Sequence, residues 1–187
     1  LLQYITSQGK KNLVKPPVKY EHVSIDNSAL SHLLQHFWRW VVEFFPLWFS
    51  PNLITVIGLV LQLAAFVVMG VFNPGFDAPV PWYVNAFCAF GCFAFQTLDA
   101  CDGKQARRTN SSSLLGDYVD HCADSISIVI MIMTAAACMR IGTGLAFFTA
   151  VTVAATSSFS ILWSEMHTGI LIFSNGSSIT EAQAIII

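Results

Sequence analysis

Acidic residues are concentrated in the stretch 98–125, which holds five of the 11 aspartates and glutamates in the chain. Apolar runs long enough to cross a membrane flank this stretch on both sides. A carboxylate at membrane depth is unfavourable unless it is paired, hydrated or bound to a cation, so such a residue is a candidate for function. The five residues are Asp99, Asp102, Asp117, Asp120 and Asp124.

Helical spacing would bring four of these carboxylates together. Asp99 and Asp102 are three residues apart and therefore share one face of a helix. Gly116, Asp120 and Asp124 follow one another at intervals of four, which stacks them on one face of a second helix. A short polar turn separates the two segments. We therefore expect two helix ends to direct four carboxylates towards one place.

Positive charge is needed at such a place, because like charges that close cannot all remain ionised. Hard divalent cations with oxygen ligands meet this need, and Mg²⁺ is usually shared between carboxylates and the phosphates of a substrate. Gly103, Ala106 and Gly116 leave room for phosphates or a neighbouring helix, and Arg107 is suited to binding phosphate. These residues predict a metal-assisted phosphoryl-transfer site at a membrane surface.

Two other interpretations of the acidic stretch stay open at this point. The aspartates could belong to a polar helix hairpin and pair with the basic residues Lys104, Arg107 and Arg108. They could also form the acid cluster of a cation channel or transporter. A transporter should carry ionisable groups at mid-membrane in several spans, whereas here they concentrate at one end of two spans.

Composition assigns the chain to the membrane proteins. Its 187 residues are 55% hydrophobic and 11% charged, whereas a soluble domain has about 25% charged residues. The chain has no basic tract for nucleic acid, and its five cysteines lack the spacing of a zinc site. It begins with Leu and ends inside an apolar run, so we expect a fragment that lacks both natural ends.

The first 45 residues are expected to lie outside the bilayer core. Residues 1–27 are polar and predict an irregular cytosolic lead-in. The segment at about 28–45 is amphipathic and predicts an interfacial helix along the membrane, with Trp38 and Trp40 at headgroup level. An amphipathic helix packed on protein is the alternative.

The remaining segments form a membrane domain over residues 28–187 in this interpretation. Four apolar segments are long enough to span a bilayer, and a fifth is cut off by the end of the chain. The expected spans are about 51–72, 82–108, 114–139, 142–163 and 179–187. We therefore predict an all-α, polytopic membrane helical bundle preceded by the interfacial helix.

Basic residues set the expected orientation. If every span crosses the membrane, eight of the nine lysines and arginines lie on one side, and only Arg140 lies on the other. Because positive charge favours the cytosolic side, the acidic stretch should face the cytosol. The segment 165–180, with Glu165 and His167, should return to the same side.

The acidic stretch also resembles a known family. Eight residues match the motif of the CDP-alcohol phosphotransferase family at every fixed position and every spacing. They read Asp99-x₂-Asp102-Gly103-x₂-Ala106-Arg107-x₈-Gly116-x₃-Asp120-x₃-Asp124. The neighbouring sequences DGKQARRTNSSS and PLWFSPNLIT, with His121 after the third motif aspartate, resemble the eukaryotic choline/ethanolamine phosphotransferase branch. The Cys-Ala order after His121 differs from that branch, but no motif position is affected.

The resemblance implies a fold, a reaction and a location. It implies the helical membrane fold of this family, usually as a homodimer, in the endoplasmic reticulum or Golgi with the active site facing the cytosol. Phosphocholine or phosphoethanolamine would pass from CDP-choline or CDP-ethanolamine to diacylglycerol, with release of CMP. The similarity covers about the N-terminal half of such an enzyme. The alternatives are a family member that uses inositol, glycerol phosphate or serine, and a non-catalytic metal-binding or transport protein of the membrane.

The resemblance also assigns roles to residues. The motif aspartates would hold Mg²⁺ or Mn²⁺, with two ions expected, through Asp99, Asp102, Asp120 and Asp124. The residues expected to bind the CDP-alcohol are Asn52, Gly103, Arg107 and Gly116. Asp117 lies outside the motif and is expected to be a solvated acid at a helix N-terminus.

We expect His121 to be the general base that takes the proton from the lipid hydroxyl. A histidine ordinarily exchanges its proton near neutral pH, whereas a carboxylate bound to a divalent cation stays ionised. His121 directly follows Asp120 and therefore lies beside the metal-binding face, where a second substrate could approach. The alternatives are that Asp124 is the base, or that His121 only donates a hydrogen bond to a metal-bound carboxylate.

Overall fold

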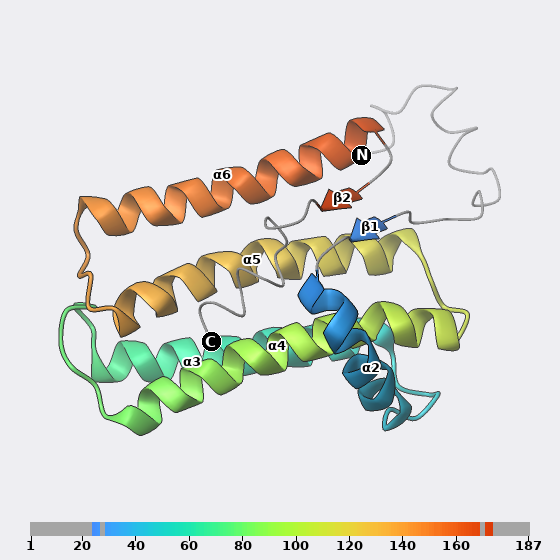
Figure 1. Cartoon of the computed structure of the whole chain (residues 1–187), viewed down its shortest axis with the longest axis horizontal. Coiled ribbons are helices and arrows are strands. Elements are labelled where there is room, and N and C mark those ends of the chain that lie inside the picture. The colour runs from blue at the N-terminus through green and yellow to red at the C-terminus, as the bar shows by residue number, and fades with distance from the viewer. Residues whose placement is uncertain (1–23, 27–28, 169–170, 174–187) are drawn as a thin grey trace, which may run out of the picture.

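The computed structural model describes residues 24–26, 29–168 and 171–173 of the chain. In this part of the chain five helices are flanked by two short strands (Figure 1). In order, the elements are β1 (Ser24–Asp26), α2 (Ala29–Glu43), α3 (Pro51–Phe72), α4 (Trp82–Arg108), α5 (Leu114–Cys138), α6 (Leu145–Thr168) and β2 (Leu171–Phe173). The predicted fold class is confirmed, because α3 to α6 form a helical bundle and are each long and apolar enough to cross a membrane.

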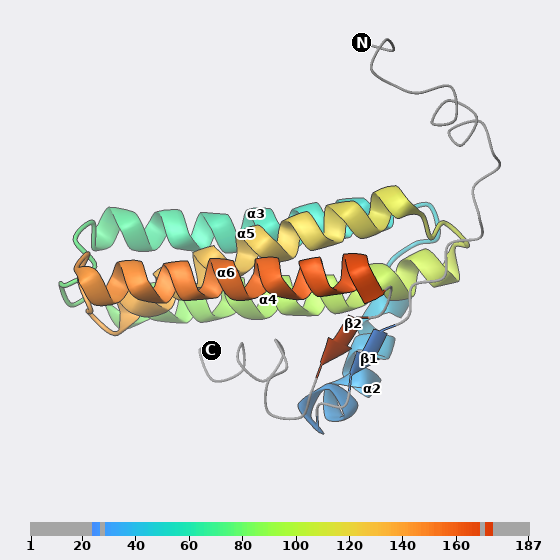
Figure 2. The same ribbon diagram turned by 90° about the horizontal axis from the view of Figure 1, so that it is seen from above.

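The bundle is formed by four long helices that run side by side (Figure 2). α3 packs most extensively on α4, and α5 packs on α3 and α6. Gly91 of α4 faces Ala65 of α3 so closely that a Cβ atom added at Gly91 would lie 2.6 Å from the Ala65 Cβ. Small residues at such a contact let two membrane helices approach, so that their van der Waals contacts stabilise the pair.

Helix limits follow local backbone chemistry. α3 begins at Pro51, where proline fits the first helical position, and it occupies the expected range. α6 begins at Leu145, later than the expected residue 142, because Arg140 and Gly142 adopt left-handed backbone angles with φ of 56° and 72°. It continues to Thr168, beyond the expected end at residue 163, so Glu165 and His167 belong to its last turns.

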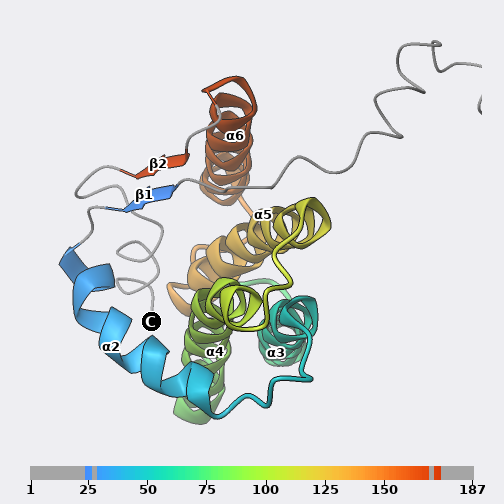
Figure 3. The ribbon, with the colours of Figure 1, turned by 90° about the vertical axis from the view of Figure 1, so that its right-hand side faces the viewer.

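α2 lies across the outer side of α4 at one end of the bundle (Figure 3). Trp38 and Val42 are buried against Cys101 of α4, whereas Trp40 and Phe44 are exposed. Trp38 therefore packs on protein and does not face lipid headgroups, while its depth in the membrane stays a prediction. An interfacial location remains consistent with Trp40, because an exposed tryptophan is typical of the headgroup region.

Side chains near the end of α4 fix the chain that joins α2 to α3. The Arg108 guanidinium donates hydrogen bonds to the carbonyl oxygens of Val42 and Phe45, at 2.9 and 2.7 Å. The buried Gln105 amide donates to the carbonyl oxygens of Pro46 and Phe49, at 3.0 and 3.2 Å. These bonds satisfy carbonyl groups at and beyond the end of α2, where no further helical turn can do so.

The two strands pair in parallel, with Ser24 opposite Leu171 and Asp26 opposite Phe173. Residues 1–27 are expected to be irregular, and for Ser24–Asp26 this expectation is wrong. The division into a lead-in and a membrane domain stays a prediction, and the expected fifth span at 179–187 lies outside the described residues.

Candidate active site

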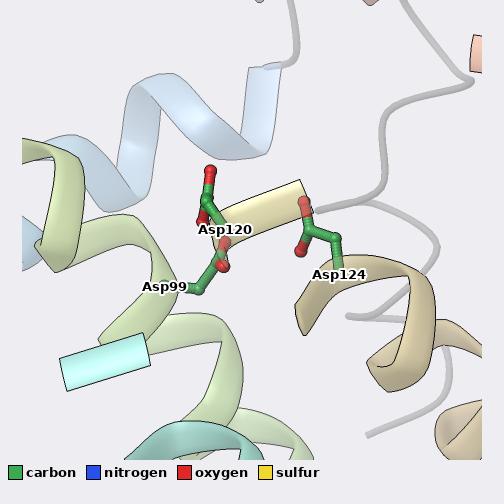
Figure 4. A group of neighbouring side chains, drawn as sticks. All are labelled: Asp99, Asp120 and Asp124. Carbon is green, nitrogen blue, oxygen red and sulfur yellow. The ribbon is translucent and has the colours of Figure 1, made fainter. Parts of the chain in front are cut away.

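Three carboxylates from two helices converge at the end of the bundle that α2 covers (Figure 4). Asp99 comes from α4, and Asp120 and Asp124 come from successive turns of α5. One carboxylate oxygen from each residue lies within 4.8 Å of the other two, and all three residues are partly buried. The spacing of these aspartates predicts this convergence, and the structure brings the three residues together.

Asp102 of α4, the remaining motif aspartate, is hydrogen-bonded to the neighbouring helix α3. Its carboxylate accepts a hydrogen bond from the Thr55 hydroxyl of α3, and both side chains are buried. Asp102 therefore lies beside the close group of three carboxylates and is not a member of it. The role of Thr55 is not predicted from the sequence, although this polar residue lies one turn after Asn52 on a helix that is otherwise almost entirely apolar.

A pocket of about 130 Å³ adjoins the carboxylates. Asp102 and Asp120 line one side of it, and Ser111 to Ser113 of the turn between α4 and α5 line another. The four residues expected to bind a CDP-alcohol all line this one pocket, and they are Asn52, Gly103, Arg107 and Gly116.

Two helix N-termini border the pocket. Pro51 and Asn52 open α3, and Ser113 caps α5 by accepting a hydrogen bond from the Gly116 amide at 3.1 Å. A Cβ atom added at Gly116 would lie 3.4 Å from the Asn52 Oδ1 atom, so glycine keeps these two helix starts close. Because backbone N–H groups at a helix N-terminus favour anions, this arrangement suits phosphate.

Arg107 is the cation of the pocket. Its exposed guanidinium makes no hydrogen bond or ion pair within the described part of the chain, and it lies 3.6 Å from the position of a Cβ atom added at Gly103. Lys104 and Arg108, by contrast, donate to main-chain carbonyl groups. Two of the three cations that a salt-bridged hairpin would require are therefore used elsewhere.

The group of three carboxylates, from Asp99, Asp120 and Asp124, has the chemistry of a site for a hard cation. The Asp99 Oδ1 atom is buried and has no hydrogen-bond partner among the described residues, which is unfavourable for a carboxylate oxygen. The three carboxylates also repel one another when ionised. Oxygen ligands at this spacing match the ligands that Mg²⁺ and similar cations prefer.

His121 lies beside this group but does not line the pocket. Its Nε2 atom is 4.0 Å from the Asp117 Oδ1 atom, one turn earlier on α5. Asp117 is in the first turn of α5, as expected, and it also lines the pocket. The spacing of four residues between Asp117 and His121 predicts this contact on a helix.

A comparison with a family model shows the class of this protein. Residues 48–173 match the model described as CDP-alcohol phosphatidyltransferase. The matched range covers α3 to α6, and with them the three converging carboxylates and the residues that line the pocket beside them. The chain therefore belongs to the CDP-alcohol phosphatidyltransferase family.

Comparison with curated relatives indicates which branch of the family the chain resembles. The chain is 39% identical over 140 residues to cholinephosphotransferase 1 of Xenopus laevis, covering 75% of this chain and 35% of that protein. It is 43% identical over 116 residues to cholinephosphotransferase 1 of Homo sapiens, covering 62% and 29%. An uncharacterized CDP-alcohol phosphatidyltransferase class-I family protein 2 of Dictyostelium discoideum is 37% identical over 184 residues, covering 98% and 44%. The chain thus spans less than half the length of these curated relatives, and the predicted resemblance to the choline/ethanolamine branch is confirmed.

Proposed function

We propose that this protein transfers phosphocholine or phosphoethanolamine from a CDP-alcohol to diacylglycerol and releases CMP. The observation that carries the proposal is the pocket lined by Asn52, Gly103, Arg107 and Gly116 next to three converging carboxylates. The similarity to cholinephosphotransferase 1 supports the choice of donor. The four membrane-length helices support a lipid acceptor, because such an acceptor reaches the site from the bilayer.

We propose that Asp99, Asp120 and Asp124, with Asp102 beside them, hold two Mg²⁺ or Mn²⁺ ions. When bound, such cations neutralise charge on the diphosphate and on the departing phosphate. Asp102 is kept in place by Thr55, so the α3 helix fixes the position of the fourth carboxylate. This positioning by a third helix supports a preorganised site.

The pocket residues would bind and orient the diphosphate of the CDP-alcohol. Arg107 can donate two parallel hydrogen bonds to phosphate oxygens. The N-terminus of α5 and the serines that precede it add backbone and hydroxyl donors at the same wall of the pocket. Gly103 and Gly116 carry no side chain, so the phosphates can approach the backbone closely.

In the transfer step, the diacylglycerol hydroxyl oxygen forms a bond to the β-phosphorus. The bond from that phosphorus to the oxygen shared with CMP breaks, and CMP leaves with its electron pair. We propose that the His121 imidazole takes the hydroxyl proton. Asp124 is the alternative base.

The basic residues and the family support a setting for this reaction. We propose an integral protein of the endoplasmic reticulum or Golgi membrane, usually a homodimer, whose site faces the cytosol. Most of its basic residues would then lie on the cytosolic side, as the charge bias favours.

The test is an assay of the full-length protein with diacylglycerol and either CDP-choline or CDP-ethanolamine. We expect release of CMP together with the matching phospholipid, and we expect a chelator of divalent cations to stop both. Incorporation of inositol, glycerol phosphate or serine instead would assign the protein to another reaction of the family. Absence of CMP release with every donor would contradict an enzymatic role.

A further inference from the structure

A second pocket, of about 390 Å³, lies between α2 and the end of α4. It is lined by Gln35, Arg39, Val42, Glu43, Lys104 and Arg107. Arg107 lines both this pocket and the pocket beside the carboxylates, so the two pockets are neighbours that share this residue.

The charges around the second pocket are unbalanced. Three cations line it with one acid, and within the described part of the chain no ion pair joins Glu43 to any of them. The Lys104 ammonium donates to the Ala100 carbonyl at 2.8 Å and lies 5.2 Å from the centre of the Trp38 ring. Because an ammonium has three donors, Lys104 retains hydrogen atoms for a ligand. An anion in this pocket would relieve the repulsion among the cations.

The location of the pocket indicates the kind of anion. α2 exposes Trp40 and Phe44, whose rings meet edge to face at 4.8 Å, and the segment after it exposes Leu47 and Trp48. Exposed aromatic and apolar side chains of this kind insert into the boundary between headgroups and acyl chains. The pocket therefore lies where a membrane-surface helix meets the end of a membrane-length helix, at the level of lipid phosphates.

We propose that this second pocket binds the phosphate of an anionic phospholipid headgroup, at a site separate from the CDP-alcohol pocket. Arginine and lysine at the cytosolic surface attract anionic lipids, and basic pockets between membrane helices bind their headgroups. Arg39 and Arg107 present guanidinium groups that match phosphate oxygens. Because Arg107 borders both pockets, a lipid bound in the second pocket also affects the affinity of the first pocket for the CDP-alcohol. This effect on affinity rests on the proposed function.

The test measures lipid binding without turnover, so its outcome does not depend on the proposed reaction. Full-length protein in neutral detergent micelles is titrated with fluorescent phosphatidate, and unlabelled phosphatidylcholine or inorganic phosphate serves as competitor. We expect saturable binding that phosphatidylcholine does not displace. The double variant Arg39→Gln, Lys104→Gln should weaken binding roughly tenfold or more, because both residues contribute attraction to an anionic headgroup.

Two variants control for charge and for folding. Arg140→Gln removes one exposed cation far from the pocket and should leave phosphatidate affinity within about twofold of wild type. Arg39→Lys keeps the charge at an exposed position and should retain most of the binding. Unchanged binding in the double variant, or an equal loss in Arg140→Gln, would overturn the proposal. Displacement of phosphatidate by an equal concentration of inorganic phosphate would also overturn it, because it would show a site for soluble phosphate.

Discussion

The two ends of the helical bundle differ in how fully their buried polar groups are hydrogen-bonded. At the end away from α2, Asn73 is fully buried, and its Oδ1 atom accepts hydrogen bonds from the amides of Asp77 and Ala78, at 3.1 and 3.0 Å. Its Nδ2 atom donates to the Ala137 carbonyl at 3.4 Å. The Gly142 amide donates to the Phe76 carbonyl at 2.8 Å, which ties the α5–α6 turn to the loop after α3.

At the α2 end, some polar groups lack such partners among the described residues, although Gln105 and Arg108 have theirs. The Asp99 Oδ1 atom is buried with no hydrogen-bond partner in the part of the chain that the structure describes, and its carboxylate lies close to those of Asp120 and Asp124. Arg107 forms no hydrogen bond or ion pair with the described residues. Buried groups with complete partners stabilise a fold, whereas incomplete groups are typical of sites that a ligand completes. We therefore assign the first end to stability and the second to function.

Substitution of a motif aspartate should have the largest effect on activity. We expect Asp99→Asn, Asp102→Asn, Asp120→Asn or Asp124→Asn to lower turnover of the full-length protein by about 10³-fold or more, because cation binding provides several kcal/mol of charge stabilisation. Removing one of the mutually repelling carboxylates should not lower the melting temperature. Steady-state assays and thermal unfolding measure the two effects, and Asp77→Asn at the opposite end is the matched control. Near-normal turnover in the Asp99, Asp120 or Asp124 variant would contradict the assignment.

His121 should affect turnover without affecting donor binding. We expect His121→Ala and His121→Gln to lower turnover by roughly 10²–10⁴-fold, the range for loss of a general base. CDP-alcohol affinity, measured separately by equilibrium binding, should stay nearly unchanged because His121 does not line the pocket. If turnover stays within a few-fold of wild type, His121 is not the base and Asp124 takes that role.

Asn73 should show the opposite pattern. We expect Asn73→Ala to lower the free energy of unfolding by about 1–3 kcal/mol, since it removes three hydrogen bonds made by a fully buried side chain. Turnover per folded molecule should be unchanged. Asn85→Ala, at an exposed position on α4, is the matched control and should leave stability nearly unaltered. A loss of activity beyond the loss of folded protein would show that the two ends are not separate in function.

Asp117 should give the smallest effect. We expect Asp117→Asn to reduce turnover only a few-fold, because this aspartate lies in the first turn of α5 and outside the group of three carboxylates. The comparison is with Asp120→Asn in the same assay. An equal loss of turnover in the two variants would contradict the assignment of Asp120, and not Asp117, as a metal ligand.

Local spacing predicts much of the fold and part of the site. The limits of α3 and α4 follow from apolar length and proline, and the meeting of Asp99 with Asp120 and Asp124 follows from helical intervals across a short turn. The hydrogen bond between Thr55 and Asp102 does not follow, because it depends on how far α3 is displaced along α4.

Two further features also depend on tertiary contacts. An amphipathic pattern does not state which apolar face meets protein, so the burial of Trp38 against α4 does not follow from it. The strand pair joins residues near 25 and 172, and no local signal links segments so far apart in the chain.

The most direct test of the carboxylate assignment is Mn²⁺ binding to the full-length protein, measured by the loss of the free-ion electron paramagnetic resonance signal. We predict that wild-type protein and Asp77→Asn bind Mn²⁺ alike, and that the double variant Asp99→Asn, Asp124→Asn binds it roughly 10²-fold more weakly or not at all. Equal binding by the double variant and the wild type would contradict the conclusion that these carboxylates form the cation centre of the site.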